Sequence, residues 1–269
     1  MPHYFQHHIL LLFLVATVFN SCSKEVPQII TNPPSTERGY LVSYTKTGSM
    51  TSDKVISNVA NLGDVANYAA YDLDIYSIIY NSLDHEETLE VSGLVFVPKD
   101  VDGEIAIFQH HHGTIIPGDD GEIPSTYTGG RRGSSEMYFI GATAAANGYV
   151  VSMPDYVGYG ATGDREHPYT VHHELAEVSV DMIRATQQLL EILSLDFSDD
   201  VFLTGWSEGG GAALRTHEYL QEKYTGEFEV KASSLFAGPY DYAGFVKHLM
   251  GERDKEDEEL SIYSWSMYA

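Results

Sequence analysis

A serine held between two glycines is the residue of this chain best suited to covalent catalysis. It lies in a stretch that fits the pattern G-x-S-x-G and follows an apolar run, Gly205-Trp206-Ser207-Glu208-Gly209. At a sharp turn from a buried strand into a helix, the flanking segments pass so closely that Cβ atoms at 205 and 209 would clash. The strain exposes the hydroxyl of Ser207, and the start of the following helix favours negative charge there. The pattern therefore predicts Ser207 as a nucleophile, the alternative being a glycine-rich turn whose serine only caps the helix.

The elements that would position this serine alternate between strands and helices. An edge strand is predicted at 40–47, a short helix at 52–62, and an antiparallel hairpin of strands at 70–81 and 88–97. Further strands are predicted at 105–109, 149–153, 201–206 and 230–237, and helices at 137–147, 172–193 and 209–224. Strands that alternate with helices form a parallel sheet covered on both faces. We therefore predict an α/β fold in one domain, with a mostly parallel sheet and antiparallel N-terminal strands.

Four segments occur in an order that resembles one known group of enzymes. They are the turn Met153-Pro154-Asp155-Tyr156-Val157-Gly158-Tyr159-Gly160, the stretch His167-Pro168-Tyr169, the stretch Asp181-Met182-Ile183-Arg184-Ala185, and the serine turn 205–210. In combination they resemble the secretory-lipase and esterase branch of the α/β-hydrolase superfamily, over about residues 90–240. The resemblance implies an α/β-hydrolase fold and cleavage of carboxylic esters through an acyl-enzyme at Ser207. A peptidase of the same fold and a catalytically inactive binding protein on the cell surface are the alternatives.

A histidine-rich segment is the second candidate for a catalytic role. It reads His110-His111-His112-Gly113-Thr114 and follows the strand expected beside that of Ser207. In hydrolases of the fold that the chain resembles, this loop supplies one backbone N–H of the oxyanion hole, and His112-Gly113 is similar to the motif found there. Glu208, directly after the serine, would supply the second N–H, and the two would stabilise a tetrahedral intermediate by a few kcal/mol. An incidental polar loop is the alternative.

Three successive histidines also raise the question of a metal site. Successive side chains on extended backbone point to alternate sides, so at most two of the three rings share a face. No H-E-x-x-H pattern accompanies them in the chain. We therefore predict no metal site and no cofactor.

The acid and the histidine that would complete a catalytic triad are harder to place. In this fold they follow the serine in the order Ser, acid, His, and only 62 residues follow Ser207. His217 lies ten residues further along a predicted helix, about 15 Å at 1.5 Å per residue, which is too far to reach back. Asp241 is a candidate acid and His248 a candidate base, in the segment where a cap region would begin near residue 240. We therefore expect a C-terminally incomplete hydrolase domain whose last strands, acid and base are missing.

Composition limits the partners of the protein. The chain has 269 residues, of which 43% are hydrophobic, enough for one large domain with a substantial core. With 15 basic and 39 acidic residues, its formal net charge is −24, which argues against binding to nucleic acid or to anionic membrane surfaces. We expect a small-molecule ester as its partner, and the composition leaves the oligomeric state open.

The N-terminus has the features of an exported protein. An apolar run of 11 residues at 9–19 is too short to span a bilayer and is typical of a signal peptide, predicted at 1–21. It is followed by Cys22, the only cysteine, in a context that resembles a bacterial lipoprotein signal. We expect a lipid on Cys22, a flexible proline-bearing tether over 22–38 and the hydrolase domain over 39–269. The protein would be a periplasmic or cell-surface lipoprotein, held to the membrane only by its lipid. An ordinary secreted protein with an incidental cysteine is the alternative.

Overall fold

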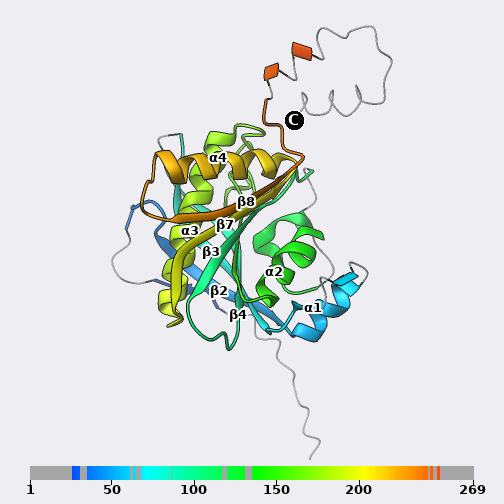
Figure 1. Ribbon diagram of the computed structural model, residues 1–269. Coiled ribbons are helices and arrows are strands. Elements are labelled where there is room, and N and C mark those ends of the chain that lie inside the picture. The colour runs from blue at the N-terminus through cyan, green and yellow to red at the C-terminus, as the bar shows by residue number, and fades with distance from the viewer. Residues whose placement is uncertain are drawn as a thin grey trace, which may run out of the picture.

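A computed structural model describes residues 26–30, 35–60, 63–64, 68–85, 87–116, 120–130, 135–241, 243–244 and 247–248 of the chain. In this part of the protein an eight-stranded sheet has helices on both faces (Figure 1). The strands are β1 Gln28–Ile29, β2 Leu41–Met50, β3 Leu73–Asp84, β4 Glu87–Pro98, β5 Ile105–His111, β6 Val150–Pro154, β7 Phe197–Trp206 and β8 Glu229–Phe236. The α-helices are α1 Ser52–Val59, α2 Ala142–Ala146, α3 His172–Ile192 and α4 Glu208–Glu222, and a π-helical segment, Met137–Gly141, precedes α2. The predicted α/β class is confirmed.

The sheet combines an antiparallel half with a parallel half. Its strand order is β1-β2-β3-β4-β6-β5-β7-β8. The strands from β1 to β4 pair antiparallel, as do β4 and β6, whereas β6, β5, β7 and β8 are parallel to one another. The β3–β4 hairpin keeps its register down to Asp84 opposite Glu87. As predicted, the antiparallel strands come from the N-terminal part and β5 lies directly beside β7, with His111 opposite Gly205.

Alternation along the central strands creates two apolar cores, one on each face of the sheet. Ile78 of β3 and Val95 of β4 belong to a core that includes Met182 of α3. Ile75 and Phe96, which pair across the same two strands, belong to the second core, where the π-helical segment and α2 pack. In Figure 1, α3 and α4 accordingly lie on one side of the sheet and α1 and α2 on the other. A slip of one residue would turn every side chain to the opposite face, so burial on both sides fixes the register.

The N-terminal residues contribute to the sheet. Gln28 and Ile29, within the segment predicted as a tether, form β1 and pair with β2, so β2 is not the edge strand that the sequence suggested. Arg38 reaches across to α3, where its guanidinium donates to Asp181 (2.9 and 3.1 Å). The predicted signal peptide and Cys22 lie outside the described residues. Within the described ranges, no helix has the length and apolar character needed to cross a bilayer.

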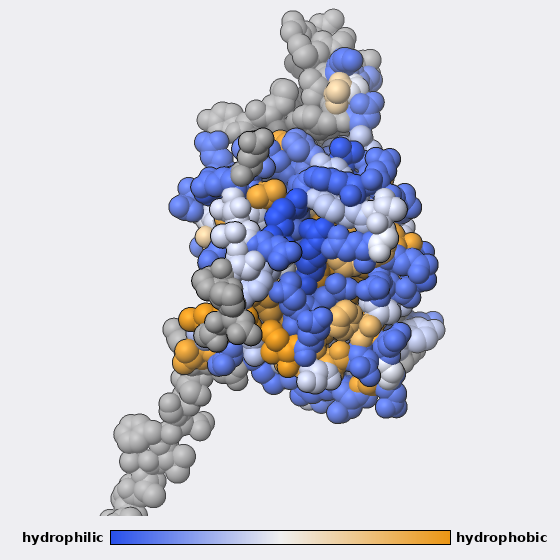
Figure 2. All heavy atoms as spheres, turned by 90° about the vertical axis from the view of Figure 1, so that its left-hand side faces the viewer, coloured by the Kyte–Doolittle hydropathy of each residue, from blue (hydrophilic) through white to orange (hydrophobic). Residues whose placement is uncertain are grey.

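The opposite end of the sheet is more open to solvent. β8 is its outer strand among the described residues, and the side chain of Phe236 at its end is 53% exposed. Tyr240, four residues later, is 49% exposed, and most of the cap region predicted from there onward lies outside the described residues. Figure 2 shows the face on the left of Figure 1, which is largely hydrophilic with smaller apolar areas between the polar ones. A polar surface of this kind agrees with the net charge of −24.

Candidate active site

Ser207 lies between β7 and α4 in a backbone conformation that few non-glycine residues adopt. Its φ is 53° and its ψ is −120°. Such a conformation costs on the order of 1–3 kcal/mol and persists only where the surroundings hold it. The Ser207 N–H donates to the carbonyl of Phe236 on β8 (2.9 Å), and the Ser207 carbonyl accepts from the N–H of Gly210 (2.9 Å). The side chain is partly exposed, and no described residue forms a hydrogen bond with its Oγ.

Backbone segments approach each other closely on both sides of this turn. A Cβ atom at Gly205 would lie 2.0 Å from the carbonyl oxygen of Gly209. A Cβ atom at Gly209 would lie 2.0 Å from the carbonyl oxygen of His111 on the neighbouring strand. Ordinary van der Waals contacts of a Cβ atom begin at 3.4 Å. Both positions therefore exclude any side chain, and the close approach is the one that the G-x-S-x-G spacing requires.

Glu208 connects the serine turn to the loop that precedes α3. As the first residue of α4, it has a backbone N–H with no acceptor among the described residues. Its buried side chain accepts hydrogen bonds from His167 Nε2 (2.9 Å) and from the N–H of Thr170 (3.2 Å). The other carboxylate oxygen, Oε2, has no hydrogen-bond partner within the described ranges. The amide predicted as an oxyanion donor is therefore free, and the side chain anchors the residue that carries it.

The second predicted oxyanion donor, the N–H of Gly113, already has a hydrogen-bond acceptor. The loop after β5 does reach the serine turn, because a Cβ atom at Gly113 would lie 2.7 Å from Cδ1 of Trp206. The N–H of Gly113, however, donates to the carboxylate of Glu136 (3.1 and 3.3 Å), which also contacts His110 Nε2 at 2.6 Å. Burial opposes the charge of Glu136, but these hydrogen bonds and the nearby imidazoles hold the pKa of its carboxyl below the usual value. In this conformation the N–H of Gly113 is already hydrogen-bonded to an anionic group, the carboxylate of Glu136.

The three adjacent histidine rings have separate partners. His110 binds Glu136 (2.6 Å), whereas His111 donates from Nδ1 to the carbonyl of Thr204 (3.0 Å). Complete burial lowers the pKa of His111 to about 3, so its ring is neutral at pH 7. His112 contacts two carbonyl oxygens, those of Gly113 (2.7 Å) and Asp155 (3.2 Å). All three side chains brace the loop and the strands beneath the serine, and they do not converge on one point.

The described residues offer no histidine in contact with the serine. His217 forms a hydrogen bond through Nδ1 with Ser233 Oγ on β8 (2.8 Å). The exposed Asp241 accepts through Oδ1 from the N–H of Gly244 (2.8 Å), so its carboxylate stabilises a local turn. His248 is exposed as well. The structure therefore shows neither a hydrogen bond from His248 to Ser207 Oγ nor one from Asp241 to His248, the two contacts that a catalytic triad with these residues would require.

Two residues at the site were not foreseen from the sequence, Glu136 and the ring of His167. Both ring nitrogens of His167 are engaged, one by Glu208 (2.9 Å) and the other by the carbonyl of Val157 (2.7 Å). The ring also packs against Tyr159, with centroids 4.6 Å apart. His167 is thus a support for the serine turn and has no nitrogen free to act as a base. Asp155, whose turn carried the family resemblance, is buried and accepts from Ser92 Oγ (2.5 Å), an interaction that fixes this loop to β4.

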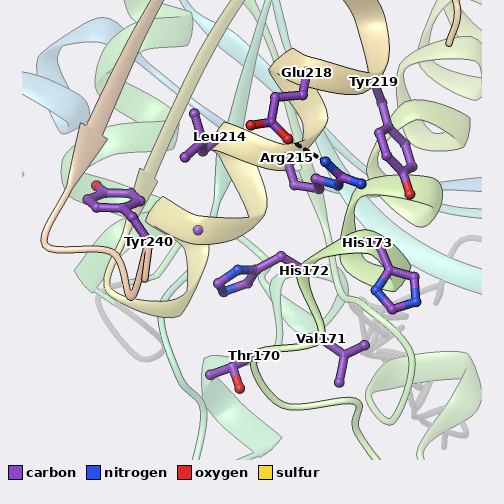
Figure 3. A pocket seen from close by; sticks show the side chains of 10 residues that line it. Thr170, Val171, His172, His173, Leu214, Arg215, Glu218, Tyr219 and Tyr240 are labelled. Atoms are coloured by element: carbon purple, nitrogen blue, oxygen red, sulfur yellow. Dashed lines mark hydrogen bonds and ion pairs between the residues drawn. The ribbon is translucent and has the colours of Figure 1, made fainter. Parts of the chain in front are cut away.

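Two cavities border residues that contact the serine turn. The first, of about 780 Å³, lies between the start of α3 and α4, and Figure 3 shows His172 between Tyr240 and the Arg215–Glu218 ion pair on its walls. The second, of about 610 Å³, lies at the carboxyl ends of β5 and β6, with His167 in its wall. Its apolar lining comes from Ile115, Ile116, Ile123 and Tyr159. In parallel sheets ligands bind beyond the carboxyl ends of the strands, which favours the second cavity as a substrate site.

Comparisons with known proteins agree with this geometry. The profile of the secretory lipase family matches residues 128–252. Among solved structures, a proposed hydrolase from Legionella pneumophila is 30% identical, with a TM-score of 0.66, over 77% of this chain and 53% of that one. The rice cell wall degrading esterase LipA from Xanthomonas oryzae is 24% identical, with a TM-score of 0.63, over 76% of this chain and 51% of that one. Candida antarctica lipase A in its closed state is 17% identical, with a TM-score of 0.51, over 76% of this chain and 43% of that one.

The chain spans about half the length of the first two of these structures, 53% and 51%. A search of the curated proteins found no match. The two structures below 25% identity share the fold, while the secretory lipase profile covers β6, α3, β7, the serine turn, α4 and β8. The chain therefore has an α/β-hydrolase fold and resembles the secretory lipases.

Proposed function

We propose that this protein is a serine hydrolase that cleaves carboxylic esters through an acyl-enzyme at Ser207. The observation that carries the proposal is the conformation of Ser207, with φ 53° and ψ −120° between two glycines that admit no side chain. Strained backbone of this kind is retained where function requires it. The similarity to secretory lipases, and to structures of an esterase and a lipase, supports an ester as the substrate.

The first half of the reaction uses groups that the structure describes. Ser207 Oγ attacks the ester carbonyl carbon and loses its proton to a base, and the carbonyl oxygen becomes an oxyanion. The unpaired N–H of Glu208, at the start of the 15-residue helix α4, stabilises this oxyanion by hydrogen bonding and through the positive end of the helix. The C–O bond to the alcohol then breaks and the alcohol takes up a proton. Water hydrolyses the acyl-enzyme in a second attack of the same kind.

Two parts of the proposed reaction, the second oxyanion donor and the base with its acid partner, require contacts that the described residues do not make. The N–H of Gly113 can join Glu208 only if it leaves the carboxylate of Glu136, because an oxyanion and a carboxylate repel each other. The base and its acid partner belong, in our proposal, to residues outside the described ranges, since no described histidine bonds Ser207 Oγ. The chain covers only about half of the first structures that it matches, which is consistent with this assignment.

The cavity at the carboxyl ends of β5 and β6 suggests where the apolar part of the ester binds. Ile115 in its wall is two residues from Gly113, and His167 in its wall is hydrogen-bonded to Glu208. The wall of this cavity is therefore adjacent to both residues proposed as oxyanion donors. An acyl chain or an aryl group would pack against these isoleucine and tyrosine side chains. This burial would contribute about 25 cal/mol of binding free energy for each Å² of apolar surface removed from water.

Turnover of short-chain nitrophenyl esters by the full-length protein tests the proposal, with Ser207→Ala as the decisive variant. We expect the rate to fall by about 10⁵-fold or more, as for loss of the nucleophile in comparable triads. Ser233→Ala is the matched control, because Ser233 is the described serine that does bind a histidine, His217 (2.8 Å). It should keep the wild-type rate within about twofold, since its strand backbone gives it no exposed, strained turn.

Two results would overturn the proposal. If Ser207→Ala keeps the wild-type rate while Ser233→Ala loses it, the nucleophile is on β8. If the wild-type protein is no faster than buffer, the hydrolase fold serves another purpose here, and a binding protein on the cell surface becomes the better account.

We also propose that the protein is exported and held to a membrane by a lipid on Cys22. Similarity to a secretory family supports export. The anchor rests on the sequence alone, because Cys22 and the apolar run before it lie outside the described residues. A cysteine that carries three acyl chains would satisfy the need for more than one lipid in stable anchoring.

A further inference from the structure

A cluster of metal-ligating side chains lies away from the serine, between the β3–β4 hairpin and the start of α3. Asp84 is the last residue of β3, His85 follows it in the hairpin turn, and Glu174 lies in the first turn of α3. Each of the three offers a ligand atom, and these atoms lie within 4.8 Å of one another. Glu174 lies 90 positions after Asp84 in the sequence, so the fold itself brings the three together.

The shortest contact in this cluster is between an imidazole and a carboxylate. His85 Nδ1 is 3.0 Å from Glu174 Oε1, and His85 Nε2 is 4.0 Å from Asp84 Oδ1. His173 adds a second imidazole, with Nε2 at 3.8 Å from the same Oε1 of Glu174. Donor atoms around a tetrahedral Zn²⁺ lie about 2.0–2.2 Å from the metal, which puts them roughly 3–4 Å from one another. The 3.0 Å between His85 Nδ1 and Glu174 Oε1 is in that range, and one ligand atom from each of Asp84, His85 and Glu174 lies within 4.8 Å of the others.

His85 lies in a left-handed turn with its ring beside the helix. Its φ is +53°, a conformation uncommon for non-glycine residues and most often adopted among them by Asn, Asp and His. Glu174 is almost fully buried, so its carboxylate needs a positive partner more than a carboxylate in water does. Arg165 neutralises the other oxygen of Asp84, Oδ2, at 2.9 Å, and leaves Oδ1 facing His85. Arg165 is shared with Glu87 (3.1 Å), so the cluster keeps an excess of negative charge.

We propose that Asp84, His85 and Glu174 bind a divalent transition-metal ion of the zinc type, with water completing a four-coordinate arrangement. Imidazole nitrogen and carboxylate oxygen are ligands that Zn²⁺ accepts, and an imidazole ligand disfavours Ca²⁺ and Mg²⁺, which prefer oxygen alone. This site is separate from the proposed ester chemistry, and its test does not depend on activity.

Metal binding would act on the active site through structure. The ion would connect the hairpin turn to the start of α3, and Thr170, four residues before Glu174, donates its N–H to Glu208 beside the catalytic serine. A ligand that binds only the folded protein stabilises it by RT ln(1 + [L]/Kd), so a site of this kind raises the unfolding temperature when metal is present. The competing explanation is a simple ion pair between a protonated His85 and Glu174, which needs no metal and contributes about 0–1 kcal/mol.

Calorimetric titration of the metal-free full-length protein with ZnCl₂ tests the proposal, with thermal unfolding in the presence and absence of Zn²⁺ as the second readout. The variants are His85→Asn and Glu174→Gln. Asparagine tolerates the left-handed backbone at 85, so this variant should fold. His248→Ala is the matched control, because it removes an exposed histidine outside the cluster.

We expect wild type and His248→Ala to bind one more Zn²⁺ than His85→Asn does, and to unfold at a higher temperature with Zn²⁺ than without it. Both cluster variants should weaken this site by at least about 10-fold and lose the thermal shift, while their metal-free unfolding temperatures stay near that of wild type. Equal stoichiometry and affinity in wild type and His85→Asn would overturn the proposal and leave the ion pair. Binding that persists in both cluster variants but disappears in His173→Ala would also overturn it, since a single exposed histidine would then explain the uptake.

Discussion

Replacing Gly209 by alanine tests the steric account of the serine turn. The added Cβ atom would lie 2.0 Å from the carbonyl oxygen of His111, 2.5 Å from its carbonyl carbon and 2.5 Å from the carbonyl oxygen of His112. Each of these atoms belongs to backbone, so none can rotate away as the end of a side chain would. To reach ordinary contact at 3.4 Å, α4 or the loop after β5 must move by more than 1 Å.

Overpacking of this kind costs about 1–3 kcal/mol, and contact with three backbone atoms places Gly209→Ala at about 3 kcal/mol. For a domain of 150–250 residues, each kcal/mol lowers the unfolding temperature by about 2–4 °C, so we expect a decrease of about 6–12 °C. The same displacement would move Glu208 and Ser207, and we expect ester turnover to fall by about 100-fold or more, since misplacement by 1 Å has effects of that size.

Gly163→Ala is the matched control for this experiment. Its nearest neighbour would be the carbonyl oxygen of Gly160 at 3.4 Å, and its φ is −63°, which alanine adopts without strain. Its unfolding temperature should stay within about 4 °C of wild type, because a glycine-to-alanine change at a compatible position alters stability by about 1 kcal/mol or less. If Gly209→Ala resembles Gly163→Ala in both unfolding temperature and turnover, the close approach at the serine turn has no energetic meaning and the reasoning is refuted.

Three further predictions concern other parts of the chain. Burial lowers the pKa of His111 from its ordinary value of 6.5 to about 3 in the folded protein, so between these values only the unfolded state takes up its proton. Stability should therefore fall by up to about 1.4 kcal/mol per pH unit below pH 6.5, and urea unfolding should show a smaller loss of stability between pH 7 and 5 in His111→Gln than in wild type. Arg38→Met removes one of the cations on the buried Asp181 and should lower the free energy of urea unfolding by about 2 kcal/mol, whereas Lys231→Met, at an exposed ion pair, should change it much less. Cys22→Ser should move the protein from the membrane fraction to the soluble fraction on cell fractionation, and an unchanged distribution would contradict the lipid anchor.

The sequence predicted those features that depend on local pattern. Segments rich in Tyr, Ile and Val identified the β3–β4 hairpin, and the alternation of strands with helices identified the parallel strands, whose burial on both faces favours continuous apolar runs. Glycine spacing located the serine turn, because the steric requirement at 205 and 209 acts within five residues of chain. The position of β5 beside β7 followed from the usual layout of such sheets.

The features that the sequence did not predict depend on contacts between distant segments. The hydrogen bond between Glu136 and Gly113 joins residues 23 positions apart, and that between His167 and Glu208 joins residues 41 positions apart. No periodic pattern in the sequence predicts either pair. β1 is two residues long, too short for an alternation pattern, and its pairing with β2 is visible only once the sheet is formed. The start of the helix predicted at 137–147 is π-helical at Met137–Gly141, a local widening that the 3.6-residue period does not distinguish.

The central claim is that Ser207 is the nucleophile, and covalent trapping tests it most directly. The full-length protein is treated with an organophosphonate that phosphonylates activated serines, then digested and mapped by mass spectrometry. The account predicts one adduct, on the peptide that contains Ser207, and loss of ester turnover in proportion to the fraction labelled. An adduct on another residue, such as Ser233, or full turnover after complete labelling of Ser207, would contradict it.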